Sequence, residues 1–181
     1  MTTYVVLVRG INVGGKNKLS MAALKTCLEE LGFTDVSTYL ASGNVILSSS
    51  QSAAAIQGKI EKALPRSFKL DSELIKVLAL TRAQFKAMVS ARPKGFGDQP
   101  KTYHSDAIFL MGIKAAEAMK VFDPREGVDA VWPGKGVIYH QRLSAKRTKS
   151  RLSKVVGTPA YKSMTIRSWA TTAKLLELLE R

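Results

Sequence analysis

Short apolar runs alternate with longer amphipathic stretches along this chain, a pattern that predicts strands separated by helices. The expected elements of the first half are a strand at 4–9, a helix at 21–31, hairpin strands at 36–41 and 45–48, a helix at 53–64 and a strand at 73–80. Ser20 is suited to cap the first helix, and Pro65 to close the second. This βαββαβ order is typical of a ferredoxin-like lobe.

The second half repeats a similar order after a connecting helix at 81–91. The expected elements are a strand at 107–111, a helix at 115–122, hairpin strands at 128–132 and 137–141, and helices at 145–156 and 166–180. Ser144 and Thr165 are the expected caps of these last two helices, which leaves only residues 162–165 for a final strand.

These patterns predict an α+β fold made of two ferredoxin-like (βαββαβ) lobes related by duplication. Both sheets are expected to be antiparallel, with helices packed on one face. The predicted domains are an N-terminal lobe with its connecting helix at 1–91, a linker rich in Gly and Pro at 92–106, and a C-terminal lobe with a basic helix at 107–181.

Composition narrows the cellular setting. The chain has 181 residues and a single cysteine, Cys27, so it cannot form an internal disulfide. Its start lacks the basic segment and long apolar stretch of a signal peptide, and no run of about 18 apolar residues occurs. We therefore expect a cytoplasmic protein with no membrane partner.

The charge is strongly one-sided, with 28 Lys and Arg against 14 Asp and Glu. No acidic residue lies between Ala130 and Leu176, a stretch that holds ten basic residues. On a helix at 145–156, four of these would share one face, opposite the apolar residues. The predicted polyanion-binding residues are Arg142, Lys146, Arg147, Arg151, Lys154 and Arg167. Such a ridge suits a phosphate backbone, and the alternative is a solvated face that aids solubility.

The Gly-rich loop at 10–17 is the sharpest local motif. It nearly fits the phosphate-binding pattern G-x-x-x-x-G-K-[ST], but Asn17 stands where the magnesium-binding hydroxyl should be. The flanking βαββ order is also wrong for a nucleotide hydrolase. Both departures argue against nucleotide hydrolysis.

A weaker anion-binding role stays open, because backbone N–H groups before a helix can hold an anion. The candidate residues for a ligand- or anion-binding loop, with the neighbouring hairpin turn, are Arg9, Gly10, Asn12, Gly14, Gly15, Lys16, Asn17, Ser42 and Asn44. The alternative is structural: the glycines allow positive φ, and the asparagines satisfy backbone groups.

Four segments together carry a resemblance: residues 9–17, 28–33, 42–45 and 165–171. On these the chain resembles the bacterial family catalogued as domain of unknown function 1697. The resemblance implies two ferredoxin-like halves and no established activity, substrate or catalytic residue. In one departure, Ser168 and Ala170 replace asparagines that the family usually has, which puts in doubt any ligand those asparagines bind.

Catalytic signals are sparse. His104 and His140 are the only histidines, so with one cysteine a His/Cys-rich zinc site is excluded. No nucleophile motif stands beside either histidine, and we expect no cofactor and no metal. The function is therefore unknown from sequence, with two hypotheses. The first is non-enzymatic binding of nucleic acid or another polyanion by the basic C-terminal surface. The second is binding of a small phosphorylated ligand, with or without catalysis, at the loop 10–18.

Overall fold

The N-terminal lobe has the predicted βαββαβ order. In the computed structural model, which describes residues 1–72 and 75–181, its elements are β1 (Thr2–Arg9), α1 (Met21–Glu30), β2 (Thr34–Tyr39), β3 (Asn44–Ser49), α2 (Ala53–Ser67) and β4 (Lys76–Thr81). The strands form an antiparallel sheet in the order β2-β3-β1-β4. The first two residues of the predicted fourth strand, Glu73 and Leu74, lie outside the described residues.

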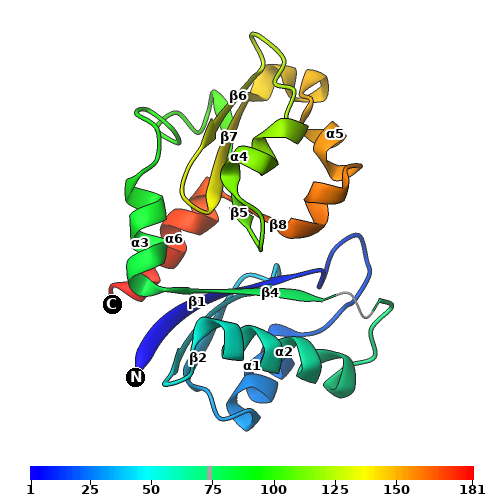
Figure 1. Ribbon diagram of the computed structural model, residues 1–181, viewed down its shortest axis with the longest axis vertical. Helices are drawn as coiled ribbons and strands as arrows, with labels where there is room; N and C mark the ends of the chain where they lie inside the picture. Colours follow the sequence, from blue (N-terminus) through cyan, green and yellow to red (C-terminus); the bar gives the residue numbers. More distant parts are fainter. Residues whose placement is uncertain (73–74) are drawn as a thin grey trace. The chain divides into compact units, whose positions relative to one another are not determined.

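Strand alternation explains this lobe's core. Tyr4, Val6 and Val8 of β1 point to one face of the sheet, where the apolar sides of α1 and α2 cover them. Figure 1 shows both helices on the same face of the sheet. Ser20 caps α1 as predicted, its side chain accepting from the Ala23 backbone. The prediction that Pro65 closes α2 was wrong, since the helix continues to Ser67.

The C-terminal lobe repeats the topology. After α3 (Arg82–Ser90), its elements are β5 (Tyr103–Leu110), α4 (Ala115–Ala118), the 3₁₀ turn η1 (Met119–Val121), β6 (Asp129–Pro133), β7 (Val137–Leu143), the 3₁₀ segment η2 (Ser144–Lys149), α5 (Leu152–Val156), η3 (Pro159–Ser163), β8 (Met164–Ser168) and α6 (Trp169–Leu179). The sheet order β6-β7-β5-β8 matches that of the first lobe position by position. Two ferredoxin-like lobes are thus present.

One face of the second sheet carries this lobe's core. Ile108, Ile138 and Met164 pack there with Ala118 of α4 and Val155 of α5. In Figure 1, α4 and α5 both lie along this sheet. Because neighbouring residues of a strand point to opposite faces, this arrangement also decides which side chains of β7 and β8 can reach α5.

The chain divides into two compact units, one formed by Met1–Phe85 with Glu177–Arg181 and the other by Lys86–Leu176. These limits differ from the predicted boundaries at 91 and 107, because most of α3 belongs to the second unit. The predicted linker at 92–106 also ends too late, because the strand that follows it begins at Tyr103. Tyr103–Asp106 pair with β7 as the first residues of β5, so those four residues are strand.

The predicted helix at 145–156 was wrong for residues 145–151, whereas residues 152–156 are helical. The segment is a kinked 3₁₀ turn, η2, followed after Ser150 by the five-residue helix α5. At residues 150 and 151 the break is held by Asp129 on β6: its carboxylate accepts the Ser150 hydroxyl and the Arg151 backbone N–H, at 2.6 and 2.9 Å. These bonds hold residues 150 and 151 out of a continuous helix.

The last helix also starts later than predicted. Residues Met164–Ser168 pair with β5 as β8, so Thr165 lies within a strand and caps nothing. Ser168 takes the capping role instead, since its hydroxyl oxygen accepts the Thr171 backbone N–H at 3.2 Å.

Candidate anion-binding groove

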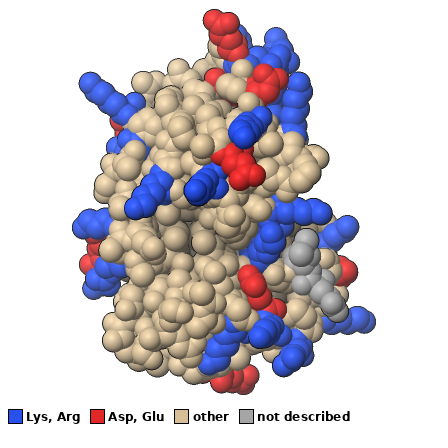
Figure 2. Space-filling model, in the orientation of Figure 1, with Lys and Arg blue, Asp and Glu red and all other residues tan. Residues whose placement is uncertain are grey.

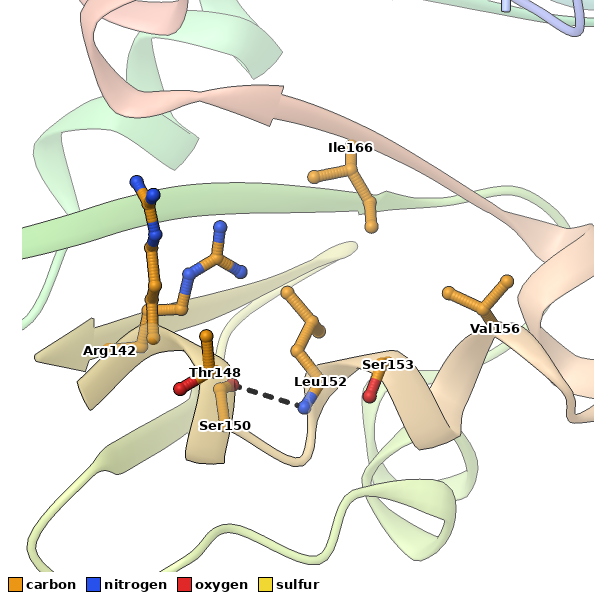
Figure 3. Close-up of a pocket in the computed structure, with 8 residues that line it drawn as sticks. Arg142, Thr148, Ser150, Leu152, Ser153, Val156 and Ile166 are labelled. Carbon is orange, nitrogen blue, oxygen red and sulfur yellow. Dashed lines mark hydrogen bonds between the residues drawn. The ribbon is translucent and has the colours of Figure 1, made fainter. Parts of the chain in front are cut away.

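A groove with a volume of about 470 Å³ lies in the C-terminal lobe, between β7, η2, α5 and β8. Figure 3 shows its side chains gathered from these elements. The lining residues are Arg142, Arg147, Thr148, Ser150, Leu152, Ser153, Val156 and Ile166. The groove thus combines two arginines, three hydroxyl groups and three aliphatic side chains, and none of these lining residues is acidic.

Asp129 shapes the wall of this groove. Besides Ser150 and Arg151, it accepts the Arg125 backbone N–H at 3.0 Å. Burial by itself would raise the pKa of Asp129, but the bonds from Arg151, Ser150 and Arg125, together with nearby His140, hold this pKa below its usual value. The carboxylate is therefore charged at neutral pH and ties β6 to the start of α5.

His140 lies next to the Asp129 carboxylate. Its Nε2 lies 3.3 Å from Asp129 Oδ1, and its side chain is 1% exposed. Burial lowers the pKa of His140, although Asp129 and Asp106 oppose this effect. The imidazole is therefore neutral at pH 7. Its Nδ1 is buried and has no hydrogen-bond partner among the described residues.

Arg142 and Arg147 supply the charge of the groove. Arg142 Nη1 is 4.0 Å from Asp106 Oδ2, a long contact, and the buried Arg142 Nε has no hydrogen-bond acceptor within the described part of the chain. Arg147 is exposed, and no described carboxylate lies within ion-pair distance of it. Both guanidinium groups thus retain donors for an incoming anion.

The other predicted basic residues do not form a common ridge. Arg151 Nη1 and Lys154 Nζ are both held by Asp123 Oδ2, at 2.8 and 3.8 Å. Lys146 is exposed on η2 but does not line the groove. Figure 2 shows lysine and arginine dispersed over the visible face, with uncharged surface between them.

Arg167 was wrongly predicted as a surface contact, because it is only 7% exposed. It follows Ile166 on β8 and therefore points to the sheet face opposite the groove. Its Nη1 donates to Thr165 Oγ1 at 2.8 Å and to the Ile166 carbonyl at 2.9 Å. Burial lowers the pKa of Arg167 to about 10, so the side chain stays charged at neutral pH.

In the N-terminal lobe, the Gly-rich loop is closed by its own side chains. Asn12 has a φ of 53°, and its Nδ2 donates to the Leu19 and Ala41 carbonyls at 3.0 and 2.8 Å. Its Oδ1 accepts the Leu19 N–H at 2.9 Å. All polar groups of this amide are used inside the fold, and they join the loop to the hairpin turn.

Asn17 has a similar role. Its Nδ2 donates to the Gly10 carbonyl at 2.7 Å, while its Oδ1 accepts the backbone N–H groups of Asp71 and Ser72. Its own N–H donates to Asp71 Oδ2 at 2.7 Å. Asn17 is 4% exposed. The residue that replaces the Ser or Thr of the phosphate-binding pattern therefore makes hydrogen bonds inside the protein.

The hairpin turn lies beside this loop, and its polar side chains also make hydrogen bonds inside the protein. Asn44 is fully buried, and its Nδ2 donates to the Tyr39 carbonyl and the Ser42 hydroxyl. The Gly43 carbonyl accepts the Val8 N–H at 2.9 Å. The structure therefore brings the loop and the turn together, but through internal bonds that favour the structural interpretation of both. The remaining candidates Arg9, Gly14, Gly15 and Lys16 are partly or fully exposed.

Sequence reasoning found the two arginines of the groove and missed the rest of it. Thr148, Ser150 and Ser153 carried no signal, and neither did the pairing of Asp129 with His140. Among the described residues, no group of three His, Cys, Asp or Glu could hold a metal ion. No described helix has the length and apolar character needed to cross a membrane.

Comparison with known proteins supports the family resemblance and the fold. No curated protein matches this chain. A solved structure, that of a conserved bacterial protein from Streptococcus pneumoniae, is similar with a TM-score of 0.79 and 26% identity, over 100% of this chain and 99% of the other. Residues 1–139 match a family described as protein of unknown function. The chain therefore belongs to the DUF1697 family.

Proposed function

We propose that this protein binds a small anionic ligand in the C-terminal groove, with Arg142 and Arg147 as the cationic contacts. The observation that carries the proposal is that both arginines line one groove of about 470 Å³ that has no acidic lining residue. A guanidinium group pairs with phosphate or carboxylate through two parallel hydrogen bonds. The volume falls within the range of small-molecule sites.

The partly exposed side chain of Arg142 strengthens the proposal. It is 24% exposed, so part of this side chain is open to an anion in the groove. The hydroxyl groups of Thr148 and Ser153 line the same groove and can donate to further oxygens of the ligand. The arrangement supports binding and identifies no group suited to catalysis.

This proposal modifies both hypotheses drawn from the sequence. A nucleic-acid ridge needs several unpaired cations on one face, whereas Arg151 and Lys154 share Asp123 and Arg167 is buried. A ligand at the Gly-rich loop needs free polar groups, but the side-chain amides of Asn12 and Asn17 already donate to backbone carbonyls of the loop. What remains of the two is an anion site at the C-terminal arginines.

Calorimetric titration with inorganic phosphate and pyrophosphate at low salt tests the proposal. The double variant R142Q/R147Q is expected to weaken binding at least tenfold. The matched control is K16Q/K18Q, which removes the same charge from the Gly-rich loop and should keep most of the affinity. Equal losses in the two variants would mean that only net charge matters, and no binding at all to the unchanged protein would reject the site.

A second titration with a single-stranded oligonucleotide separates the ligand classes. The proposal expects any oligonucleotide binding at about 50 mM salt to be weak and to fall steeply as salt is raised. Tight oligonucleotide binding that survives R142Q/R147Q but is lost in K146Q/K149Q would instead favour a polyanion surface on η2.

A further inference from the structure

Most of the polar and apolar lining side chains lie at different ends of the groove. Figure 3 shows Arg142, Thr148 and Ser150 toward one end and Val156 toward the other, with Leu152 and Ser153 between them and Ile166 above. The apolar residues come from two elements, α5 and β8, so the apolar part is a wall and not an isolated side chain. A bare inorganic anion would contact only the polar end.

The apolar wall is incompletely covered by the protein. Val156 is 51% exposed and is the one large hydrophobic residue described as exposed in the C-terminal lobe. Leu152 and Ile166 are partly buried, and their inner sides pack against the core of the lobe. Leu152 and Val156 are four residues apart on α5 and therefore lie on the same side of it. An apolar group placed here would remove hydrocarbon surface from water, which is favourable.

We propose that the ligand of this groove is amphipathic: a phosphate or similar anionic headgroup joined to an apolar group of a few carbon atoms. This inference rests on the proposed function and adds the chemical class of the ligand. The headgroup binds at Arg142 and Arg147, and the apolar group lies against Leu152, Val156 and Ile166. The ligand in this proposal is a dissolved small molecule, because a groove of about 470 Å³ suits one small molecule.

A series of alkyl and aryl phosphates tests this inference, since all are soluble monomers that share one headgroup. Titrations with methyl, butyl and phenyl phosphate are expected to show affinity rising with apolar size. A methylene that leaves water completely adds up to about fourfold in affinity, so butyl phosphate should bind at least about tenfold more tightly than methyl phosphate.

Val156 offers a substitution that spares the fold, because half of its side chain is already exposed. V156N should weaken butyl phosphate binding by about threefold or more, from the lost apolar contact, and leave methyl phosphate binding unchanged. The matched control is V13N, since Val13 is an exposed valine of the N-terminal lobe, at 64%. V13N should change neither affinity.

The possible results distinguish the anion site from the amphipathic class of its ligand. If methyl, butyl and phenyl phosphate bind equally and all depend on Arg142 and Arg147, the amphipathic ligand is rejected and the anion site stands. If affinity rises with apolar size but V156N has no more effect than V13N, the apolar contact lies elsewhere and the inference is also rejected. If no phosphate compound binds, the proposed function itself fails.

Discussion

The Asp129 carboxylate lies 3.3 Å from Nε2 of His140, and each of these side chains is 1% exposed. The same carboxylate accepts the Ser150 hydroxyl and the Arg151 backbone N–H. One buried carboxylate therefore links β6 and β7 to the segment that enters α5. Since Ser150 and Leu152 line the groove, the shape of the groove depends on this contact.

D129N should destabilise the protein. An amide keeps one acceptor oxygen but places an NH₂ group where the carboxylate accepts protein donors, so at least one buried donor loses its partner. The free energy of unfolding is expected to fall by about 1–3 kcal/mol in urea denaturation. The control is D123N, which removes an exposed carboxylate that pairs with the same segment and should cost less than about 1 kcal/mol. Equal effects would show that Asp129 has no special role.

Stability should fall at mildly acidic pH because of His140. Burial lowers the pKa of His140, so the folded protein takes up a proton there less readily than the unfolded chain, whose imidazole pKa is near 6.5. The contribution of neutral His140 to the free energy of unfolding is complete above about pH 6.5. It is lost as the pH falls further, by at most about 1.4 kcal/mol per pH unit. The lowered pKa of Asp129 acts in the same direction, but only near and below pH 3.8.

Urea denaturation between pH 7.5 and 5 measures this dependence. H140Q should flatten the slope of unfolding free energy against pH in that window, whatever its effect on stability at pH 7.5. Asp129, Asp106 and Arg142 also face this imidazole and remain in place in the variant. H104Q, which removes the 47% exposed histidine, controls for loss of an imidazole. An unchanged slope in H140Q would contradict the assignment.

G43A should destabilise the N-terminal lobe more than G14A does. Both glycines have positive φ, 82° and 57°, so both substitutions carry a backbone cost. A Cβ on Gly43 would lie 2.6 Å from the Val8 carbonyl oxygen, whereas one on Gly14 would meet nothing within 4 Å. Chemical denaturation should therefore show G43A at least about 1 kcal/mol less stable than G14A. Similar losses would mean that the turn can shift away from β1.

N17A should lower stability and leave the C-terminal groove unaffected. The substitution removes the acceptor of two backbone N–H groups and the donor to Gly10, and it puts alanine at a φ of 49°. A loss of about 2–4 kcal/mol in urea denaturation is expected. K16A, at the exposed neighbouring position, is the control and should change stability little. A stable N17A that instead binds phosphate more weakly would revive the loop as a ligand site.

Local pattern was sufficient for much of the fold. The alternation of Tyr4, Val6 and Val8 predicts a strand with one buried face, and this is how β1 packs against α1 and α2. Ser20 caps α1 because capping needs only residues within one helical turn. The βαββαβ order of elements also predicted the antiparallel sheets that the structure has.

The same local reasoning failed at residues 144–156 and at Arg167. The helical pattern at 145–156 is real, but Asp129, which is 21 residues before Ser150, binds that backbone and interrupts it. Arg167 falls at a position that local pattern assigns to a helix, but pairing with β5 makes it part of β8 and turns its side chain away from the groove. In both places a long-range contact outweighed a local preference.

The sequence by itself determined two ferredoxin-like lobes, most of their elements and a C-terminal third without acidic residues between Ala130 and Leu176. Those properties depend on hydrophobic periodicity and composition, which act between near neighbours or over the whole chain. Only the tertiary structure decided which cations are free to bind. Pairing with Asp123, burial on β8 and exposure in the groove each depend on residues distant in sequence, and these contacts left Arg142 and Arg147 beside an apolar wall.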